Sequence, residues 1–231
     1  MKILVTGSNR GLGLEIATQY AADGWQVFAA CRHPADAQAL HALAESYSGV
    51  SIHRLDVTRT EDMRSIAREL AGEPLDLLFN NAGVYLEQDY DLPKLGAVRY
   101  DDWLRTFEVN TLGAVRVTEA LIENLRAAPR ALVAVMTSHM GSIGDIDMPG
   151  SLYYRSSKAA LNAAMQGLAA ELDPAGIGVL LLHPGGVATR MGPPDGITPE
   201  ESVAGLRQQV AAFELTQTGR FVRYDGTEMP W

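Results

Sequence analysis

The N-terminal part of the chain contains the pattern that most restricts its fold: a short apolar segment, a glycine-rich turn and an apolar periodicity. Residues 2–6 (Lys-Ile-Leu-Val-Thr) are typical of a buried parallel strand. Gly7, Gly11 and Gly13 follow at once, and the spacing of apolar residues over 12–22 predicts a helix. Glycine allows the positive φ and close backbone approach that a turn around a pyrophosphate requires, and a helix N-terminus supplies free N–H donors. The pattern predicts a dinucleotide site; the alternative is an ordinary strand-to-helix turn.

Strand-like and helix-like segments alternate along the rest of the chain. This alternation predicts an α/β fold, a Rossmann-like, doubly wound parallel sheet of about seven strands with helices on both faces. The expected strands are 1–6, 25–30, 50–55, 75–80, 131–137, 177–182 and 219–223, and the expected helices are 12–22, 35–47, 60–71, 100–127, 153–172 and 199–213. The 231 residues fit one domain, 1–231. Segments 84–98 and 185–198 follow strand ends on the ligand side of such a sheet, so we expect them to be irregular substrate loops.

Composition argues against several classes of protein. A single cysteine, Cys31, excludes an internal disulfide framework and a cysteine-based metal cluster. The formal charge of −9 argues against a nucleic-acid partner. No apolar stretch is long enough to span a membrane, and residues 1–6 form a strand rather than a signal segment. We therefore expect a cytoplasmic protein without a metal, membrane or nucleic-acid partner.

A second pattern concerns Tyr154 and Lys158, which are four residues apart in the expected helix 153–172. Residues at this spacing share a helix face, so the lysine charge is expected to lower the pKa of the phenol from about 10 toward the range of acid–base catalysis. Tyr153 is adjacent, but only Tyr154 has a lysine four residues on. A Tyr-x-x-x-Lys match alone is a weak signal, because this spacing arises by chance.

Together, the two patterns resemble the short-chain dehydrogenase/reductase family. The Gly-x-x-x-Gly-x-Gly spacing departs from the commoner Gly-x-Gly-x-x-Gly fingerprint and matches this family. Further matches follow in order along almost the whole chain: Asn80-Asn81-Ala82-Gly83, Asn110, Ser138, Pro184-Gly185, Val187 and Thr189. The resemblance implies a nicotinamide cofactor and hydride transfer between its nicotinamide and a small-molecule carbonyl or secondary alcohol substrate.

The resemblance implies four catalytic residues: Asn110, Ser138, Tyr154 and Lys158. Tyr154 would exchange a proton with the substrate oxygen, and Ser138 would donate a hydrogen bond to the same oxygen. Lys158 would lower the pKa of Tyr154 and hold the nicotinamide ribose, and Asn110 would position a water that links Lys158 to solvent. Thr137 and Ser142 are alternatives to Ser138, because the gap from Ser138 to Tyr154 is longer than the family's commonest spacing.

The end of the second strand favours NADP(H) over NAD(H). An acid about 20 residues past the glycines normally holds the adenosine ribose, but Cys31-Arg32 stands here, and Arg10 lies inside the glycine turn. Two guanidinium groups without a carboxylate favour a 2′-phosphate; the alternative is two solvated arginines. The residues expected at the cofactor are Gly7, Ser8, Asn9, Arg10, Gly11, Leu12, Gly13, Arg32, Asp56, Val57, Asn81, Ala82, Gly83, Tyr154, Lys158, Pro184, Gly185, Val187 and Thr189. For Asp56, expected near the adenine, the alternative is a helix N-cap.

Other residues near the expected site carry weaker signals. An apolar substrate pocket, or ordinary loop packing, is predicted from Tyr85, Met140, Ile143, Met148 and Met191. His139 and His183 flank the site in sequence, and we expect packing roles for both. The tail 219–226 with Pro230-Trp231 resembles the C-factor and sniffer-like carbonyl reductase branch of the family.

Two further expectations concern assembly and function. Family members pair through long helices, and the Ala- and Leu-rich segments 100–127 and 153–172 predict a homodimer or homotetramer; the alternative is burial against the chain's own sheet. The competing function is a catalytically silent dinucleotide-binding regulator of the same fold. A sugar-nucleotide epimerase or dehydratase would resemble a longer chain.

Overall fold

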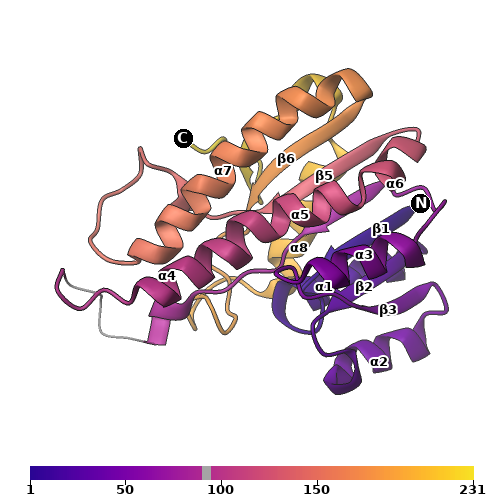
Figure 1. Cartoon of the computed structure of the whole chain (residues 1–231), viewed down its shortest axis with the longest axis horizontal. Helices are drawn as coiled ribbons and strands as arrows, with labels where there is room; N and C mark the ends of the chain where they lie inside the picture. Colours follow the sequence, from indigo (N-terminus) through magenta and orange to yellow (C-terminus); the bar gives the residue numbers. More distant parts are fainter. Residues whose placement is uncertain (90–94) are drawn as a thin grey trace.

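The computed structural model describes residues 1–89 and 95–231, which form a seven-stranded parallel sheet between two layers of helices (Figure 1). The strands are β1 (Lys2–Thr6), β2 (Gln26–Cys31), β3 (Val50–Arg54), β4 (Leu77–Asn80), β5 (Ala131–Met136), β6 (Ile177–His183) and β7 (Phe221–Arg223). Their order in the sheet is β3-β2-β1-β4-β5-β6-β7, and all neighbours are parallel. The predicted Rossmann-like fold is confirmed.

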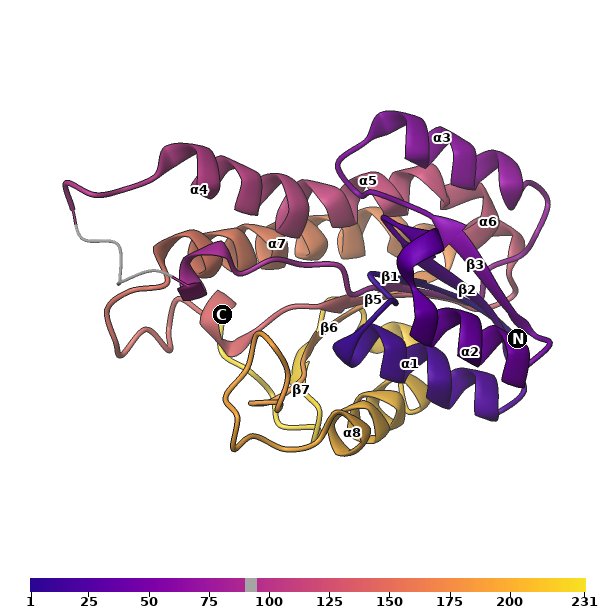
Figure 2. The same cartoon turned by 90° about the horizontal axis from the view of Figure 1, so that it is seen from below.

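Helices cover both faces of the sheet, as Figure 2 shows. One layer contains α3 (Thr60–Glu69), α4 (Tyr100–Phe107), α5 (Gly113–Ala120), α6 (Ile122–Ala127) and α7 (Leu152–Leu172), and the other contains α1 (Gly11–Ala22), α2 (Gln38–Ser46) and α8 (Pro199–Ala211). Successive strand residues point to opposite faces, so Leu4 packs in the first layer, whereas Ile3 and Val5 pack in the second. Burial on both faces explains why the central strands β4, β5 and β6 are nearly continuous apolar runs, whereas β3 at the edge of the sheet is not.

The strand order reverses at β1: the chain first extends the sheet on one side of this strand and then crosses to the other side with β4. β2 and β3 lie on one side of β1, whereas β4 to β7 lie on the other. Such a switch opens a crevice at the carboxyl ends of the strands. At this point the backbones after β1 and β4 approach closely, because a Cβ on Gly7 would lie 3.0 Å from the Cα of Ala82.

The expected long helix 100–127 is interrupted. α4 runs into a π-helical turn, η3 (Glu108–Leu112), before α5, and Leu121 separates α5 from α6. Single π turns within α-helices are found mostly at functional sites, and this one contains Asn110. The short 3₁₀ helices are η1 (Pro34–Asp36), η2 (Leu86–Asp89), η4 (His139–Gly141), η5 (Asp173–Ala175) and η6 (Leu215–Gln217).

The two expected loops both lie at the carboxyl ends of strands. Segment 84–98 contains η2, and its residues 90–94 lie outside the described part of the chain. Segment 185–198 is closed at its base by a parallel β-bridge between Val187 and Ile197, with the Ile197 N–H 2.9 Å from the Gly186 carbonyl oxygen. Over residues 1–89 and 95–231, no helix is long and apolar enough to cross a lipid bilayer.

Candidate active site

A cavity of about 870 Å³ lies at the carboxyl ends of the strands, over the switch between β1 and β4. The glycine turn, the ends of β2, β4, β5 and β6, the first turns of α7 and the segment after His183 line it. It contains almost all of the predicted site residues: Gly7, Asn9, Arg10, Gly11, Leu12, Gly13, Arg32, Asp56, Val57, Asn81, Ala82, Gly83, Ser138, Tyr154, Lys158, Pro184, Gly185, Val187 and Thr189. Ser8 and Asn110 do not line it. Residues far apart in sequence therefore meet in one site.

The glycine turn has the geometry that its sequence requires. Gly7 and Gly11 have φ of +67° and +53°, values that disfavour residues with a Cβ. A Cβ on Gly13 would lie 2.3 Å from the Gly7 carbonyl oxygen, so the first turn of α1 packs directly on the end of β1. The Ser8 hydroxyl donates to the Ala30 carbonyl at 3.0 Å and ties the turn to β2. Ser8 thus supports the turn and does not face the cavity.

The segment after β4 holds the glycine turn in place. The Thr6 hydroxyl accepts hydrogen bonds from the backbone N–H groups of Asn81 and Ala82, both at 3.0 Å. The Asn81 amide donates to the carbonyls of Thr6 and Gly7 at 2.9 and 3.3 Å. These contacts steady the central sheet next to the cavity.

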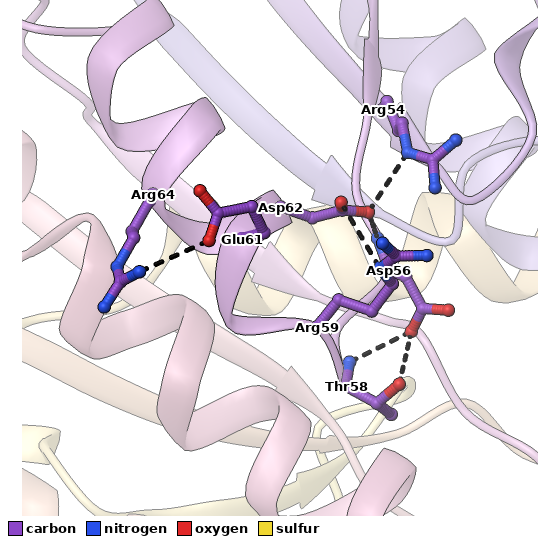
Figure 3. Close-up of polar contacts among 7 residues, drawn as sticks. All are labelled: Arg54, Asp56, Thr58, Arg59, Glu61, Asp62 and Arg64. Carbon is purple, nitrogen blue, oxygen red and sulfur yellow. Dashed lines mark hydrogen bonds and ion pairs between the residues drawn. The ribbon is translucent and has the colours of Figure 1, made fainter.

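Arg32 and Asp56 follow β2 and β3 and line the cavity at that end, and Arg10 lines it from the glycine turn; both arginines are exposed. The Oδ1 atom of Asp56 accepts hydrogen bonds from the backbone N–H and hydroxyl of Thr58, at 3.0 and 2.7 Å (Figure 3). Burial alone would raise the pKa of Asp56, but these bonds and the nearby Arg105 and Arg32 charges lower it. A charged carboxylate therefore stands among guanidinium groups at this end.

Asp56 does not cap α3, whose N-cap is Arg59. Instead, the Asp62 carboxylate accepts a hydrogen bond from the Asp56 backbone N–H at 2.9 Å and pairs with Arg54 at 3.4 Å (Figure 3). The N-cap alternative for Asp56 is therefore wrong. Its carboxylate makes a turn with Thr58 through Oδ1 only, which leaves Oδ2 outside that turn.

The opposite end of the cavity contains Tyr154, Ser138 and Lys158. A hydrogen bond with the Ser138 side chain acts on the Tyr154 phenol. Thr137 also lines the cavity, but its hydroxyl donates to Asn162 at 2.6 Å, and Ser142 does not line the cavity. Of the three candidates, Ser138 is thus the one whose side chain meets Tyr154.

Tyr153 and Tyr154 have different surroundings. Tyr153 is fully buried, and its hydroxyl accepts a hydrogen bond from the Arg99 backbone N–H at 2.7 Å. Tyr154 lines the cavity and stacks on Tyr85, with ring centroids 4.5 Å apart and planes at 28°. The geometry favours Tyr154 as the cavity phenol, as the lysine spacing predicted.

The pKa values of the Tyr154–Lys158 pair correct one expectation. Burial raises the pKa of Tyr154 to about 12, although the Ser138 hydrogen bond opposes this shift. Burial also lowers the pKa of Lys158 to about 8. The Lys158 Nζ lies 5.7 Å from the Tyr154 ring centroid and donates to the Met136 carbonyl at 2.8 Å. The pKa of Tyr154 is therefore raised in this structure rather than lowered as expected, because burial is the largest influence and Lys158, hydrogen-bonded to the Met136 carbonyl, is not among the groups that act on the phenol.

Asn110 lies behind the cavity wall and is buried. Its side-chain oxygen accepts a hydrogen bond from the Val84 N–H at 2.8 Å. Its side-chain N–H₂ donates to the Val84 carbonyl at 2.9 Å and to the Ser157 hydroxyl at 3.0 Å. The π turn thereby ties the segment after β4 to α7, one residue before Lys158. The role in positioning a water stays a prediction.

His139 and His183 both line the cavity, with ring centroids 5.0 Å apart. Burial lowers the pKa of both, that of His183 to about 3, and the neighbouring His139 and Arg223 contribute to the shift at His183. Both rings are therefore neutral near pH 7. Among the described residues, no group of three His, Cys, Asp or Glu side chains is arranged to hold a metal ion.

Acidification is expected to destabilise the fold through His183. The unfolded chain binds a proton at this imidazole below the ordinary pKa of 6.5, whereas the folded chain does so only near 3, so stability is lost as the pH falls between these values. From pH 7 to 5 the free energy of unfolding should fall by about 2 kcal/mol from this group. Denaturant titrations of the wild type and His183→Phe at both pH values measure this difference, with His33→Phe as an exposed control. Equal pH slopes in all three proteins would contradict the prediction.

The expected apolar lining is only partly correct. Tyr85, Met140 and Met191 line the cavity, but Ile143 and Met148 do not, and their side chains are 70% and 64% exposed. Arg105, which no sequence pattern had indicated, also lines the cavity and adds positive charge near Asp56. The C-terminal tail reaches the segment after Ser138, since the Gly144 N–H donates to the Trp231 carbonyl at 2.8 Å.

Comparison with known proteins agrees with this geometry. A model of the short chain dehydrogenase family matches residues 1–198. The chain belongs to the short-chain dehydrogenase/reductase family. This short-chain dehydrogenase is 42% identical over 170 residues to the C-signal of Myxococcus xanthus, an alignment that covers 73% of this chain and all of its relative.

Solved structures of carbonyl reductases show the same likeness over the whole chain. The carbonyl reductase Sniffer of D. melanogaster superposes with a TM-score of 0.92 at 31% identity, covering 100% of this chain and 99% of its own. An NADPH-bound carbonyl reductase from chicken fatty liver gives a TM-score of 0.90 at 29% identity, with coverage of 100% and 98%. The predicted resemblance to a carbonyl reductase-like branch of the family is confirmed.

Proposed function

We propose that this short-chain dehydrogenase is an NADP(H)-dependent oxidoreductase that interconverts a carbonyl compound and a secondary alcohol. The observation that carries the proposal is the convergence of Tyr154, Ser138 and Lys158 on the cavity that also contains the glycine turn. The strands that position these residues all belong to one sheet, the first beginning at Lys2 and the last ending at Arg223. We therefore propose that residues 1–231 form a single domain.

The residues at the glycine turn fit a dinucleotide. Gly11 has a positive φ and nothing within 4 Å of the position that a Cβ would take, so the backbone there is open to a ligand. α1 begins at Gly11, and its N-cap residue Arg10 makes no side-chain capping bond, which leaves N–H donors for a pyrophosphate. Asp56 would meet the adenine, and Pro184 to Thr189 would enclose the nicotinamide. When bound, the cofactor supplies or accepts the hydride.

The chain's own residues handle the proton. Tyr154 would protonate the substrate oxygen as negative charge develops on it, and Ser138 would donate a hydrogen bond to the same oxygen. A pKa near 12 makes Tyr154 a weak acid and its phenolate a strong base, but an alkoxide is a stronger base still. This order makes proton transfer from the Tyr154 hydroxyl to a developing alkoxide favourable, whereas the direction of the overall reaction is set by the substrate and the cofactor.

Arg10 and Arg32 support a preference for NADP(H), because they line the cavity where the adenosine ribose would lie and Cys31-Arg32, rather than a carboxylate, stands at the end of β2. The NADPH bound by the chicken reductase is consistent with this preference. A homodimer or homotetramer stays a prediction, supported by apolar side chains of Tyr100, Leu104 and Leu112 that are 68%, 70% and 47% exposed.

Removing one arginine should weaken the binding of NADPH but not that of NADH. Arg32→Ala is expected to raise the KM for NADPH by about 10- to 100-fold, because one or two charge-assisted hydrogen bonds to the 2′-phosphate would be lost. The KM for NADH should change by less than about threefold. Steady-state kinetics with both cofactors measure the effect. Arg64→Ala is the matched control, since Arg64 lies on α3 and pairs with Glu61 at 3.3 Å. Equal losses with NADPH and NADH would remove the phosphate role from Arg32.

The proposal as a whole is tested by titrating the purified chain with NADPH and NADH and following cofactor oxidation with a panel of aldehydes and ketones. Turnover that requires both cofactor and carbonyl compound supports the proposal. Tight NADPH binding without turnover on any compound would instead indicate the dinucleotide-binding regulator. Binding of neither cofactor would contradict both functions.

A further inference from the structure

The N-terminus of α7, the helix that carries Tyr154 and Lys158, is capped from outside the helix. Its own N-cap residue, Ser151, has left-handed backbone angles of φ 53° and ψ 35° and makes no side-chain capping bond. A helix N-terminus leaves N–H groups without intrahelical partners. A side-chain acceptor normally comes from the N-cap residue itself, but here it comes from another segment of the chain.

That acceptor is Glu87, in η2. Its carboxylate lies 2.9 and 3.1 Å from the Tyr153 N–H nitrogen and 3.2 Å from the Tyr154 N–H nitrogen. Only 3% of Glu87 is exposed, and none of the ion pairs among the described residues includes it. Negative charge at a helix N-terminus also interacts favourably with the helix dipole.

A second contact from the same segment reaches the same turn. Tyr85, two residues before Glu87, stacks on the Tyr154 ring, and its hydroxyl is hydrogen-bonded to the Ser151 hydroxyl. The segment 85–87 therefore holds Tyr154 at its ring and at its backbone N–H. Because Tyr85 also lines the cavity, this segment connects the cavity wall with the catalytic turn of α7.

We propose that Glu87 is a positioning residue for Tyr154: its buried carboxylate fixes the first turn of α7 so that the Tyr154 hydroxyl lies beside Ser138. The inference rests on the proposed function, in which Tyr154 transfers the proton. Glu87 acts through the backbone and touches neither Ser138 nor the glycine turn, so it should affect the proton transfer more than cofactor binding.

Glu87→Gln preserves size but removes the negative charge at the helix N-terminus and replaces one acceptor oxygen with an amide N–H₂, which cannot accept from an N–H group. Because Oε2 alone contacts both N–H nitrogens, Glu87→Ala, which removes both oxygens, is the decisive variant. A misplacement of about 1 Å at a catalytic group can cost about 10²-fold in rate. We expect kcat for carbonyl reduction to fall by about 10- to 100-fold, with the KM for NADPH within about threefold of the wild type. Hydrogen exchange of the Tyr153 and Tyr154 amides should become faster, while that of α1 should not change.

Glu214→Gln is the matched control, because Glu214 also caps a short helix, η6, with its side chain, away from the cavity. Its kcat should equal that of the wild type. Glu87→Ala serves as a second variant, and its thermal melting temperature is compared with that of Glu87→Gln. A proportional loss of kcat, NADPH affinity and melting temperature would show a general structural role and overturn the inference.

The remaining outcomes separate this inference from the proposed function. An active wild type with an unchanged kcat in Glu87→Ala would overturn the inference alone. A wild type that reduces no carbonyl compound would overturn the proposed function and the inference with it. A selective fall in kcat, together with faster exchange confined to the first turn of α7, supports both.

Discussion

Tyr154→Phe is expected to lower kcat for carbonyl reduction by about 10³-fold, within the range that general acid catalysis contributes. The substitution removes the phenolic proton and keeps the ring, so the stack on Tyr85 with centroids 4.5 Å apart can persist. NADPH affinity should change by less than about threefold, because the glycine turn and the arginines lie at the other end of the cavity. Stopped-flow or steady-state oxidation of NADPH measures the rate, and fluorescence titration measures the binding.

The same substitution at a distant tyrosine supplies the control. Tyr47 follows α2 and does not line the cavity, so Tyr47→Phe should retain the wild-type rate. Residual turnover within tenfold of the wild type in Tyr154→Phe would show that another group, or water, protonates the substrate oxygen. In that case the assignment of Tyr154 as the general acid would have to be abandoned.

Gly13→Ala is expected to abolish cofactor binding under ordinary assay conditions. The added Cβ would lie 2.3 Å from the Gly7 carbonyl oxygen and 2.5 Å from the Asn81 side-chain nitrogen. The first atom belongs to the backbone and the second is hydrogen-bonded to the Thr6 carbonyl, so neither moves aside easily. The first turn of α1 must therefore move away from β1, which changes the pyrophosphate cradle. We expect the Kd for NADPH to rise by at least about 100-fold and the free energy of unfolding to fall by about 1 to 3 kcal/mol.

Gly167→Ala is the matched glycine control. Gly167 lies inside α7, and nothing lies within 4 Å of its Cβ position. Alanine there should raise stability by about 0.5–1 kcal/mol, because a helix interior favours alanine over glycine. Isothermal titration with NADPH and denaturant unfolding of both variants test the pair. Wild-type NADPH affinity in Gly13→Ala would mean that the turn tolerates the shift and that close packing at Gly13 is not required.

The fold was predictable because the central strands β4, β5 and β6 are nearly continuous apolar runs and each glycine of the turn has a geometric reason. The interruption of the segment 100–127 was not predictable, since the helical pattern continues through the π turn at Glu108–Leu112 and no Gly or Pro precedes Asn110 within it. A π turn depends on tertiary contacts, here those of Asn110 with Val84 and Ser157. Local sequence carries little of that information.

The site was predictable as a set of residues but not in its electrostatics. Tyr154, Lys158 and Ser138 could be chosen by spacing and order, yet the direction of the Tyr154 pKa shift depends on burial, which spacing does not reveal. No sequence motif pointed to Glu87. Its role follows from a contact across 66 and 67 residues of sequence, which only the folded chain brings together.

The bridge between Val187 and Ile197 makes the intervening residues 188–196 a loop whose two ends are already joined. Once the ends of a loop are fixed, lengthening it is cheap, since each doubling costs only about 0.6 kcal/mol. Insertions or exchanges between Thr189 and Ile197 therefore need not disturb Tyr154, the glycine turn or the residues proposed to enclose the nicotinamide. Under the proposed function, selectivity for one carbonyl compound over another can thus change during evolution, or in a laboratory loop graft, independently of the residues that transfer the proton.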